Sequence, residues 1–302
     1  MITSIGSITL DVPDLDASIR FFTDKVGLDV TERDEAAAYL RCADRHHDLI
    51  LQRSPTGAAA LRHLNLEVEG DLAEHVAAAV AAGAIDIGPV THPGVSGAHV
   101  LEIPWGYAVK LYTGMDRVAA PSPAAIQRPF RFSHFNVTAP EVAPLADFFV
   151  AAFGLGFSDW IGSKEDPFLA WLHAPVFNAP HHGVALLKGQ PKLHHIAFDY
   201  ETVNGLIDRV DNYVDEFTHL VWGMGRHGTG GSVFAYSEDA SGLMVELDSG
   251  MISIGDDPRW SAPQVWSMTD QRAIDEWGSG IPEKWLAKHT AFVRPSSGVV
   301  VS

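Results

Sequence analysis

The feature of this sequence that most limits its fold is an internal repeat. Residues 7–30, SITLDVPDLDASIRFFTDKVGLDV, align without a gap with residues 134–157, HFNVTAPEVAPLADFFVAAFGLGF. A second pair of similar segments starts at His63 and at His195. Repeats at a fixed spacing indicate duplicated structural units, so the chain is expected to contain two copies of one domain.

The two copies are joined by residues 119–128, AAPSPAAIQR, which are rich in alanine and proline. Domain boundaries commonly fall in such linkers, and 302 residues are enough for two domains of ordinary size. We therefore predict a first domain over residues 1–118 and a second over residues 129–251. Residues 252–302 are predicted to form a C-terminal tail that walls the functional site of the second domain.

Within each copy, the pattern of one strand, one helix and a further set of strands occurs twice. Ile8, Leu10 and Val12 alternate with polar residues, which is the two-residue period of a strand with one buried face. The apolar side should face a helix, and the polar side should line a concave sheet surface. The predicted fold class is α+β, with two domains that each contain two βαβββ modules in a cupped mixed sheet.

Composition limits the partners that the chain can have. The formal net charge is −17, which argues against nucleic acid because phosphate binding needs clustered Lys and Arg. The single cysteine, Cys42, cannot form a disulfide framework and fits a reducing compartment. No apolar run approaches the roughly 20 residues of a membrane span. We therefore expect a cytoplasmic protein with neither nucleic-acid nor membrane partners.

Strand alternation distinguishes the two adjacent histidines of residues 191–201, PKLHHIAFDYE. A strict two-residue period places His194 with the apolar residues and turns His195 to the concave side. His134 occupies the same position in the preceding module. Glu246, in the segment GLMVELDSG, alternates with apolar neighbours and also faces the concave side. Two histidines and one carboxylate should therefore meet in one cup.

Two histidines and a carboxylate with open coordination positions form the facial arrangement that is typical of non-heme Fe(II) oxygenases, although Zn, Mn or Ni also accepts it. The corresponding residues of the first domain are Ser7, His63 and Lys110. A lysine ammonium is no metal ligand at neutral pH and would repel a cation. The first cup is therefore expected to be a degenerate copy without metal.

The paired modules, with the segments SHFNV, LHHIAF and MVELDSG, resemble the vicinal oxygen chelate (glyoxalase-like) superfamily over about residues 5–250. Residues 225–242, GRHGTGGSVFAYSEDASG, resemble its two-domain type I extradiol catechol dioxygenases, in which a Gly-Arg-His-Gly element precedes a tyrosine that lies nine residues after the histidine. This resemblance implies a homo-oligomeric enzyme. It would insert both atoms of O2 into a catechol next to the vicinal diol and release a hydroxymuconic semialdehyde type of product.

The resemblance also implies roles for individual residues. Fe(II), with Mn(II) as an alternative, would bind to His134, His195 and Glu246. The catalytic residues would be His182, His227 and Tyr236, where His182 is preferred to the adjacent His181 because of the segment HGVALLKG. The pocket for the catechol and O2 would include Asn136, Trp171 and Trp222.

One departure from the family bears on the substrate. Trp222 stands where family members that cleave homoprotocatechuate place an arginine to bind the substrate carboxylate, which favours a neutral or more apolar catechol. Arg226 and Arg272 stay open as other anchors. Three other functions also stay open: a metal-dependent isomerase or transferase of the same superfamily, a non-catalytic protein that binds an aromatic ligand, and a purely structural protein.

Overall fold

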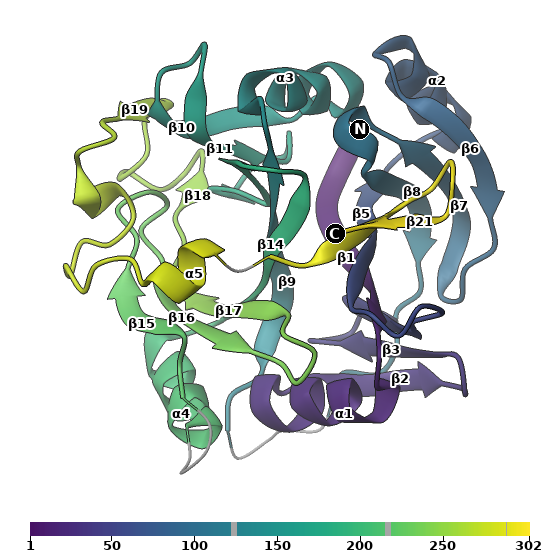
Figure 1. Cartoon of the computed structure of the whole chain (residues 1–302), viewed down its shortest axis with the longest axis horizontal. Helices are drawn as coiled ribbons and strands as arrows, with labels where there is room; N and C mark the ends of the chain where they lie inside the picture. Colours follow the sequence, from purple (N-terminus) through teal and green to yellow (C-terminus); the bar gives the residue numbers. More distant parts are fainter. Residues whose placement is uncertain (122–125, 215–218, 288) are drawn as a thin grey trace.

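The computed structural model describes residues 1–121, 126–214, 219–287 and 289–302. Figure 1 shows two curved sheets side by side, one from each half of the repeat. The predicted linker, residues 119–128, includes residues 122–125, which lie outside the described part of the chain, and the exact domain division stays a prediction.

The first half runs through two modules in which a strand and a helix are followed by three strands. Its sheet has the strand order β2-β3-β4-β1-β5-β8-β7-β6. The elements are β1 (Ile2–Val12), α1 (Leu15–Arg20), η1 (Phe21–Val26), β2 (Asp29–Arg33), β3 (Ala37–Arg41), β4 (Leu49–Arg53), β5 (Ala60–Val68), α2 (Leu72–Ala81), β6 (Ile85–Val90), β7 (Val95–Glu102), η2 (Pro104–Gly106) and β8 (Ala108–Met115).

The second half repeats this plan, with the strand order β15-β16-β17-β14-β9-β13-β11-β10. The predicted α+β class with paired βαβββ modules is confirmed. The elements are β9 (Pro129–Ala139), α3 (Val142–Phe153), β10 (Gly156–Gly162), β11 (Pro167–His173), β12 (Ala179–Pro180), β13 (Val184–Lys188), β14 (Lys192–Tyr200), α4 (Val203–Tyr213), β15 (Trp222–Arg226), β16 (Val233–Glu238) and β17 (Met244–Ser249).

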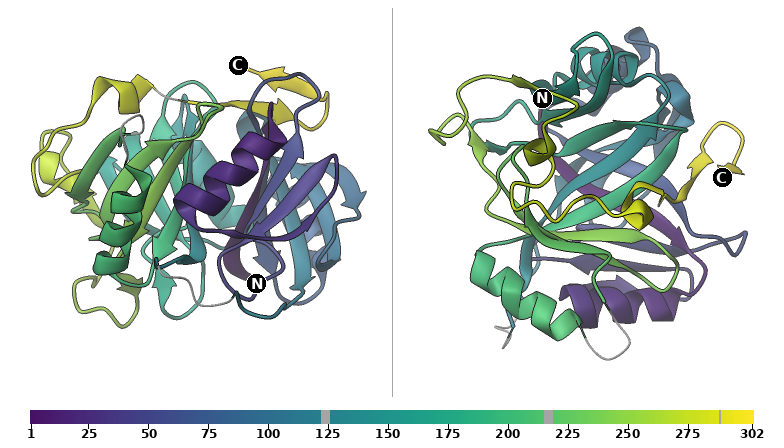
Figure 2. Two further views of the ribbon diagram at one scale, coloured as in Figure 1. Left: turned by 90° about the horizontal axis from the view of Figure 1, so that it is seen from below. Right: turned by 60° about the vertical axis from the view of Figure 1, so that its left-hand side comes forward.

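Helices cover the convex faces of the sheets, as Figure 2 shows for α1 and α4. In α3, Leu145, Phe149 and Phe153 recur at helical spacing and are buried in the main core together with residues of β11 and β13. This packing leaves the opposite, concave face of each sheet for polar side chains. The longest described helix, α3, has 12 residues, and no helix in the described ranges is long and apolar enough to cross a membrane.

The central strand pair of each sheet contains a β-bulge at the same place. In β14, Leu193 and His195 pair with successive residues of β9, so His194 is an extra residue without a partner across the ladder. Arg62 is the extra residue at the equivalent place in β5. A bulge of this kind interrupts the alternation of side chains and redirects those next to it.

The C-terminal tail joins both sheets, a connection that the sequence did not predict. Strand β19 (Gln264–Trp266) pairs in parallel with β10 and extends the outer edge of the second sheet. The chain then passes through η3 (Gln271–Ala273) and α5 (Glu283–Ala287). Strand β20 (Ala291–Arg294) belongs to the first sheet, where it pairs in parallel with β5. It also pairs with β21 (Val299–Val301). Short strand β18 (Ser253–Ile254) pairs with β12 near the start of the tail.

Candidate metal and active site

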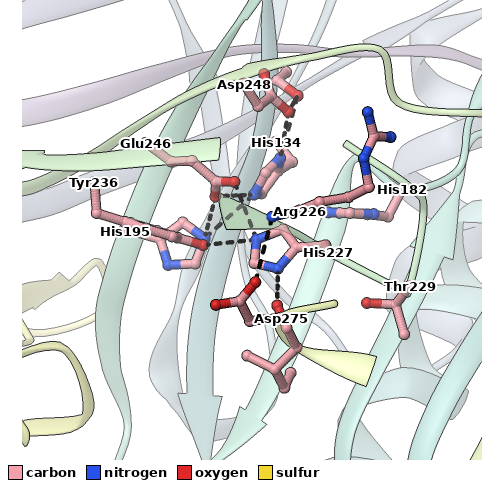
Figure 3. A network of polar contacts seen from close by, with 12 residues as sticks. His134, His182, His195, Arg226, His227, Thr229, Tyr236, Glu246, Asp248 and Asp275 are labelled. Carbon is pink, nitrogen blue, oxygen red and sulfur yellow. Dashed lines mark hydrogen bonds and ion pairs between the residues drawn. The ribbon is translucent and has the colours of Figure 1, made fainter. Parts of the chain in front are cut away.

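A cavity lies on the concave face of the second sheet, and the cup-shaped sheet and the tail enclose it. Eight of the nine predicted site residues line it, and Trp222 is the exception. Figure 3 shows the side chains of His134, His195, His227 and Tyr236 gathered around Glu246. The lining residues are His134, Asn136, Leu169, Trp171, His182, Ala185, His195, His227, Thr229, Tyr236, Glu246, Ile274 and Trp285.

His134, His195 and Glu246 come from three neighbouring strands, β9, β14 and β17, and meet at the base of the cavity. Nε2 of His134 lies 3.2 Å from Nε2 of His195. Oε2 of Glu246 lies 3.1 Å from the first of these nitrogens and 3.3 Å from the second. All three side chains are buried. The three residues expected to form a metal site are therefore in mutual contact.

The donor set fits a metal ion. Ligands that each lie about 2.1 Å from one ion are about 3.0–3.4 Å apart for perpendicular to tetrahedral arrangements, and the three separations fall within that range. Neither carboxylate oxygen of Glu246 has a well-aligned hydrogen-bond donor among the described residues. A buried carboxylate without donors is costly, and a bound cation would satisfy it.

Burial and the surrounding histidines have opposite effects on Glu246. Burial by itself would raise its pKa, but its contacts with His134, His195 and His227 outweigh burial and hold the pKa well below its ordinary value. Burial lowers the pKa of His195 to about 4. An ionised carboxylate beside a neutral imidazole is the form in which both groups bind a divalent metal.

Each ligand histidine is oriented through its second ring nitrogen. The Ser133 hydroxyl lies 3.2 Å from Nδ1 of His134 and donates to Asp248 at 2.9 Å. Nδ1 of His195 lies 2.7 Å from Nδ1 of His194, whose Nε2 lies 3.0 Å from the Trp285 carbonyl oxygen. Because a carbonyl only accepts, His194 donates from Nε2 and accepts at Nδ1 from His195. This leaves the lone pair of His195 Nε2 directed at the metal position.

His194 is therefore not on the apolar face, where strict alternation placed it. The extra residue in β14 lets His194 and His195 lie on the same side of the strand, with ring centroids 4.9 Å apart. His194 also contacts the Trp285 ring at 4.4 Å. The expectation was correct for His195 but wrong for its neighbour, because a two-residue period holds only in an uninterrupted strand.

His227 and Tyr236 lie next to Glu246, on the side of β16. Nδ1 of His227 donates to the Ile274 carbonyl oxygen, which leaves its Nε2 3.3 Å from the Tyr236 hydroxyl and 3.4 Å from Glu246. Burial, followed by the nearby Glu246 charge, raises the pKa of Tyr236 well above its ordinary value. The phenol therefore stays protonated at neutral pH and can donate a hydrogen bond into the cavity.

His182, Asn136 and Trp171 form the opposite wall. The His182 ring lies 4.5 Å from the His134 ring and 6.2 Å from Trp171. Burial, followed by the charge of neighbouring histidines, lowers the pKa of His182 well below its ordinary value, so the imidazole is neutral at neutral pH. Oδ1 of Asn136 has no hydrogen-bond partner within the described ranges. The imidazole can accept a proton from a bound molecule, and the amide oxygen of Asn136 can accept a hydrogen bond.

Trp222 does not line the cavity, which corrects its predicted place in the pocket. It is buried behind Tyr236, with ring centroids 5.5 Å apart and an interplanar angle of 11°. Its Nε1 donates to the Ser279 hydroxyl at 3.0 Å. The indole supports Tyr236 from outside the cavity because β15 pairs with the far side of β16.

The two arginines considered as substrate anchors lie outside the cavity. The Arg226 guanidinium donates to the Gly231 carbonyl at 2.7 Å and lies over the Trp277 ring. Arg272 is exposed and pairs with Asp270 at 2.8 Å. The cavity lining therefore contains no lysine or arginine among the described residues.

Five lining residues were not predicted. Strand alternation could have identified two of them, because Leu169 and Trp171 are two apart in β11 and Ala185 pairs with both Trp171 and Asn136. The other three follow only from the tertiary structure. Ile274 and Trp285 come from the tail, and Thr229 is held in place by the hydrogen bond that its hydroxyl donates to the Ala273 carbonyl.

In the first cup, Ser7, His63 and Lys110 take the places of the metal trio. Lys110 pairs across to Asn65 of β5 as Glu246 pairs to Ala197 of β14, which confirms that the two positions are equivalent. Lys110 is only 2% exposed, and burial lowers its pKa to about 7. Burial and then the Lys110 charge lower the pKa of His63 well below its ordinary value. This donor set does not fit a cation.

Replacement of Lys110 by methionine is expected to stabilise the protein, most strongly at low pH. A folded-state pKa near 7 lies below the ordinary value of 10.5, so the unfolded chain holds the proton more tightly between these values and stability rises with pH there. The Lys110→Met variant should gain about 3–5 kcal/mol near pH 7 and about 1–2 kcal/mol near pH 9.5. Urea unfolding at both pH values measures the difference.

The matched control is Lys164→Met, since Lys164 is exposed on the second half. It should change the free energy of unfolding by less than about 1 kcal/mol at either pH. A Lys110→Met gain that is the same at both pH values would show that the buried lysine does not carry the predicted penalty.

Comparison with known proteins relates this chain to a group of enzymes. A family model described as a glyoxalase-like domain matches residues 7–112. Metapyrocatechase 2 of Cupriavidus necator is 29% identical, over 94% of this chain and 91% of its own length. The manganese-dependent 2,3-dihydroxybiphenyl 1,2-dioxygenase of Geobacillus genomosp. 3 is 27% identical, over 88% of this chain and 90% of its own length.

A solved structure gives the same result for the fold. Homoprotocatechuate 2,3-dioxygenase from Arthrobacter globiformis superposes with a TM-score of 0.87 and 24% identity, over 100% of this chain and 95% of that one. The expected resemblance to the extradiol dioxygenases of the vicinal oxygen chelate superfamily is confirmed.

Proposed function

We propose that this chain, a relative of the extradiol dioxygenases, opens the ring of a catechol with O2. Cleavage would occur next to the vicinal diol and give a hydroxymuconic semialdehyde type of product. The observation that carries the proposal is the His134, His195 and Glu246 trio at the base of a buried cavity. The same cavity contains three further groups that can move or hold protons, at His182, His227 and Tyr236.

We infer that the metal is Fe(II), with Mn(II) as the alternative. Two neutral nitrogens and one carboxylate suit either ion, and one relative is manganese-dependent by name. When bound, the ion supplies a place where catechol and O2 meet and a charge that lowers the pKa of the catechol hydroxyls. The trio would hold it, while His194 and Ser133 orient the ligand rings.

The remaining side chains of the cavity handle protons and position the ring. Nε2 of His182 can accept the proton of a catechol hydroxyl and later return it, since a neutral imidazole suits both directions. The protonated Tyr236 can donate a hydrogen bond to a catechol oxygen, beside His227. Leu169, Trp171 and Ile274 supply apolar walls that exclude water from the ring.

The lining favours a catechol without a charged substituent. A carboxylate in a buried site needs a cationic partner or several donors. Among the described lining residues no lysine or arginine is present. We therefore propose a neutral or alkyl- or aryl-substituted catechol as the substrate.

The proposal also covers the oligomeric state of the protein and its location in the cell. Several of the large exposed apolar side chains belong to the tail, which supports contact between copies of the chain. We propose a homo-oligomer located in the cytoplasm, without nucleic-acid or membrane partners. The exposed apolar side chains of the tail are those of Val265, Met268, Trp277, Ile281, Leu286 and Val299.

The decisive test is anaerobic loading with Fe(II), or in parallel with Mn(II), followed by addition of catechol, 3-methylcatechol, 2,3-dihydroxybiphenyl or 3,4-dihydroxyphenylacetate and admission of air. The expected result is O2 uptake in proportion to a yellow ring-opened product, with the carboxylate-bearing catechol as the poorest substrate. Metal binding without O2 uptake for any catechol would overturn the proposal and favour an isomerase, a transferase or a binding protein.

A further inference from the structure

Adjacent histidine pairs occur at three places in the structure, and in each pair the two Nδ1 atoms are in contact. The separations are 3.0 Å for His46 and His47, 3.1 Å for His181 and His182, and 2.7 Å for the pair in β14. When both rings are neutral, one Nδ1 must donate and the other must accept. The group at the outer Nε2 of each pair therefore decides the direction of the hydrogen bond.

For the pair at the cavity, that group is Asp159 in β10. Its Oδ2 lies 3.3 Å from Nε2 of His181; the contact is not aligned as a hydrogen bond, and Nε2 has no hydrogen-bond partner among the described residues. His181 is fully buried, and the Asp159 side chain is only 4% exposed. Asp159 is also held by the tail, since it accepts from the Gln264 backbone at 2.8 Å and from the Trp266 indole at 3.0 Å.

These contacts fix which ring nitrogen carries the hydrogen, first in His181 and then in His182. A carboxylate oxygen at this distance favours an N–H over a lone pair opposite it, which places the His181 proton at Nε2 and a lone pair at Nδ1. His182 must then donate from Nδ1, and its lone pair lies at Nε2. His182 lines the cavity, and Nε2 is the nitrogen left over for a bound molecule.

We propose that Asp159 and His181 are positioning residues that hold His182 as the Nδ1–H tautomer, with the Nε2 lone pair available to the substrate hydroxyl. They act through His182 and do not touch the substrate. His182 can then accept the first proton without a rearrangement of the ring. The importance of this tautomer for turnover rests on the proposed function, whereas the tautomer itself does not.

The first half of the chain contains a matched copy of this arrangement. Oε2 of Glu32 lies 3.4 Å from Nε2 of His46, which contacts His47. Asp159 and Glu32 occupy the same place in the repeat, on β10 and β2. However, the Glu32 side chain is 56% exposed, and β2 is the edge strand of its sheet, whereas β19 covers Asp159. Only the copy in the second half is sealed from water.

The tautomer can be measured directly in the metal-free protein. Nitrogen-15 spectra of histidine-labelled protein near pH 7.5 distinguish Nδ1–H from Nε2–H imidazoles, and the His182 signals are assigned by their loss in His182→Ala. We expect the Nδ1–H form in the unsubstituted protein and in Asp159→Glu. We expect the Nε2–H form or a mixture in Asp159→Asn, because an amide can donate to His181.

Kinetics with the metal-loaded enzyme give the second readout. Asp159→Asn should lower kcat by about 10–100-fold with little change in KM or metal content. Asp159→Glu should recover most of this loss because it restores an acceptor. Glu32→Gln is the matched control and should leave kcat unchanged. If Asp159→Asn does not fold, His181→Asn tests the same link, because its side chain can replace Nδ1 but cannot reach Asp159.

The outcomes separate this inference from the proposed function. An Nε2–H tautomer for His182 in the unsubstituted protein, or an unchanged tautomer in Asp159→Asn, would overturn the inference whatever the enzyme does. Equal losses in Asp159→Asn and Glu32→Gln would assign both carboxylates a structural role only. If no catechol is turned over but the tautomer changes as expected, the inference about His182 stands and the proposed function fails.

Discussion

His195→Ala is expected to abolish metal binding and, with it, turnover. The Nε2 atom of His195 lies 3.2–3.3 Å from the other two ligand atoms, so its loss leaves only His134 and Glu246. Changes to residues behind a ligand typically cost about 10–100-fold in metal affinity or activity, and loss of the ligand itself should cost more. Metal content after dialysis and the rate of O2 uptake measure the two effects.

The repeat supplies a matched control for this experiment. His63→Ala removes the equivalent histidine of the first cup, where Lys110 prevents cation binding. We expect metal content and turnover to be unchanged in this variant. Retention of metal by His195→Ala, with normal turnover, would contradict the assignment of the trio.

His194→Ala should give an intermediate result. Simple strand alternation predicts that this residue is irrelevant to the metal, whereas the structure places it in contact with Nδ1 of His195. We expect metal affinity to fall by about 10–100-fold, which is the usual effect of removing a group that orients a ligand. A metal affinity equal to that of the unsubstituted protein would mean that His194 does not orient the His195 ring.

The second large effect is expected for His182→Asn. This change removes the proton acceptor at Nε2 but leaves the trio and its supporting residues in place. General acid–base catalysis typically contributes about 10²–10⁴-fold, so kcat should fall by that amount while metal content stays constant. Stopped-flow measurement under single-turnover conditions separates the chemical step from product release.

His47→Asn is the corresponding control, because the strand pairing places His47 in the first half where His182 lies in the second. We expect its turnover to be normal. If His182→Asn retained full kcat, the proton transfer would have to be assigned to another group of the cavity, such as His227 or Tyr236.

Much of the fold could be predicted because the sequence contains the same design twice. The repeat predicted two related halves, and the alternation of Ile8, Leu10 and Val12 predicted which side of the central strand packs into the hydrophobic core. The path of the tail could not be predicted in this way. Strands β19 and β20 are short and resemble nothing in the repeat. They form because distant strands offer them partners, namely the edge strand β10 for β19 and the start of β5 for β20.

The meeting of His134, His195 and Glu246 was predictable for a similar reason. His134 and His195 are at equivalent positions of equivalent strands, and Lys110 in place of Glu246 marks the first cup as different. The bulge at His194 could not be predicted, because one extra residue does not visibly change the pattern of apolar residues around it.

By itself, the sequence determined the duplicated modules, the apolar side of the central strand and the three residues that meet at the base of the cavity. These follow from local periodicity and from the repeat, which need no knowledge of distant contacts. The tertiary structure alone decided that His194 supports His195, that Trp222 lies behind Tyr236, and that Ile274 and Trp285 close the cavity. It also decided that Asp159 reaches His182 through His181, because strand pairing and burial bring together residues whose separation in the chain carries no such information.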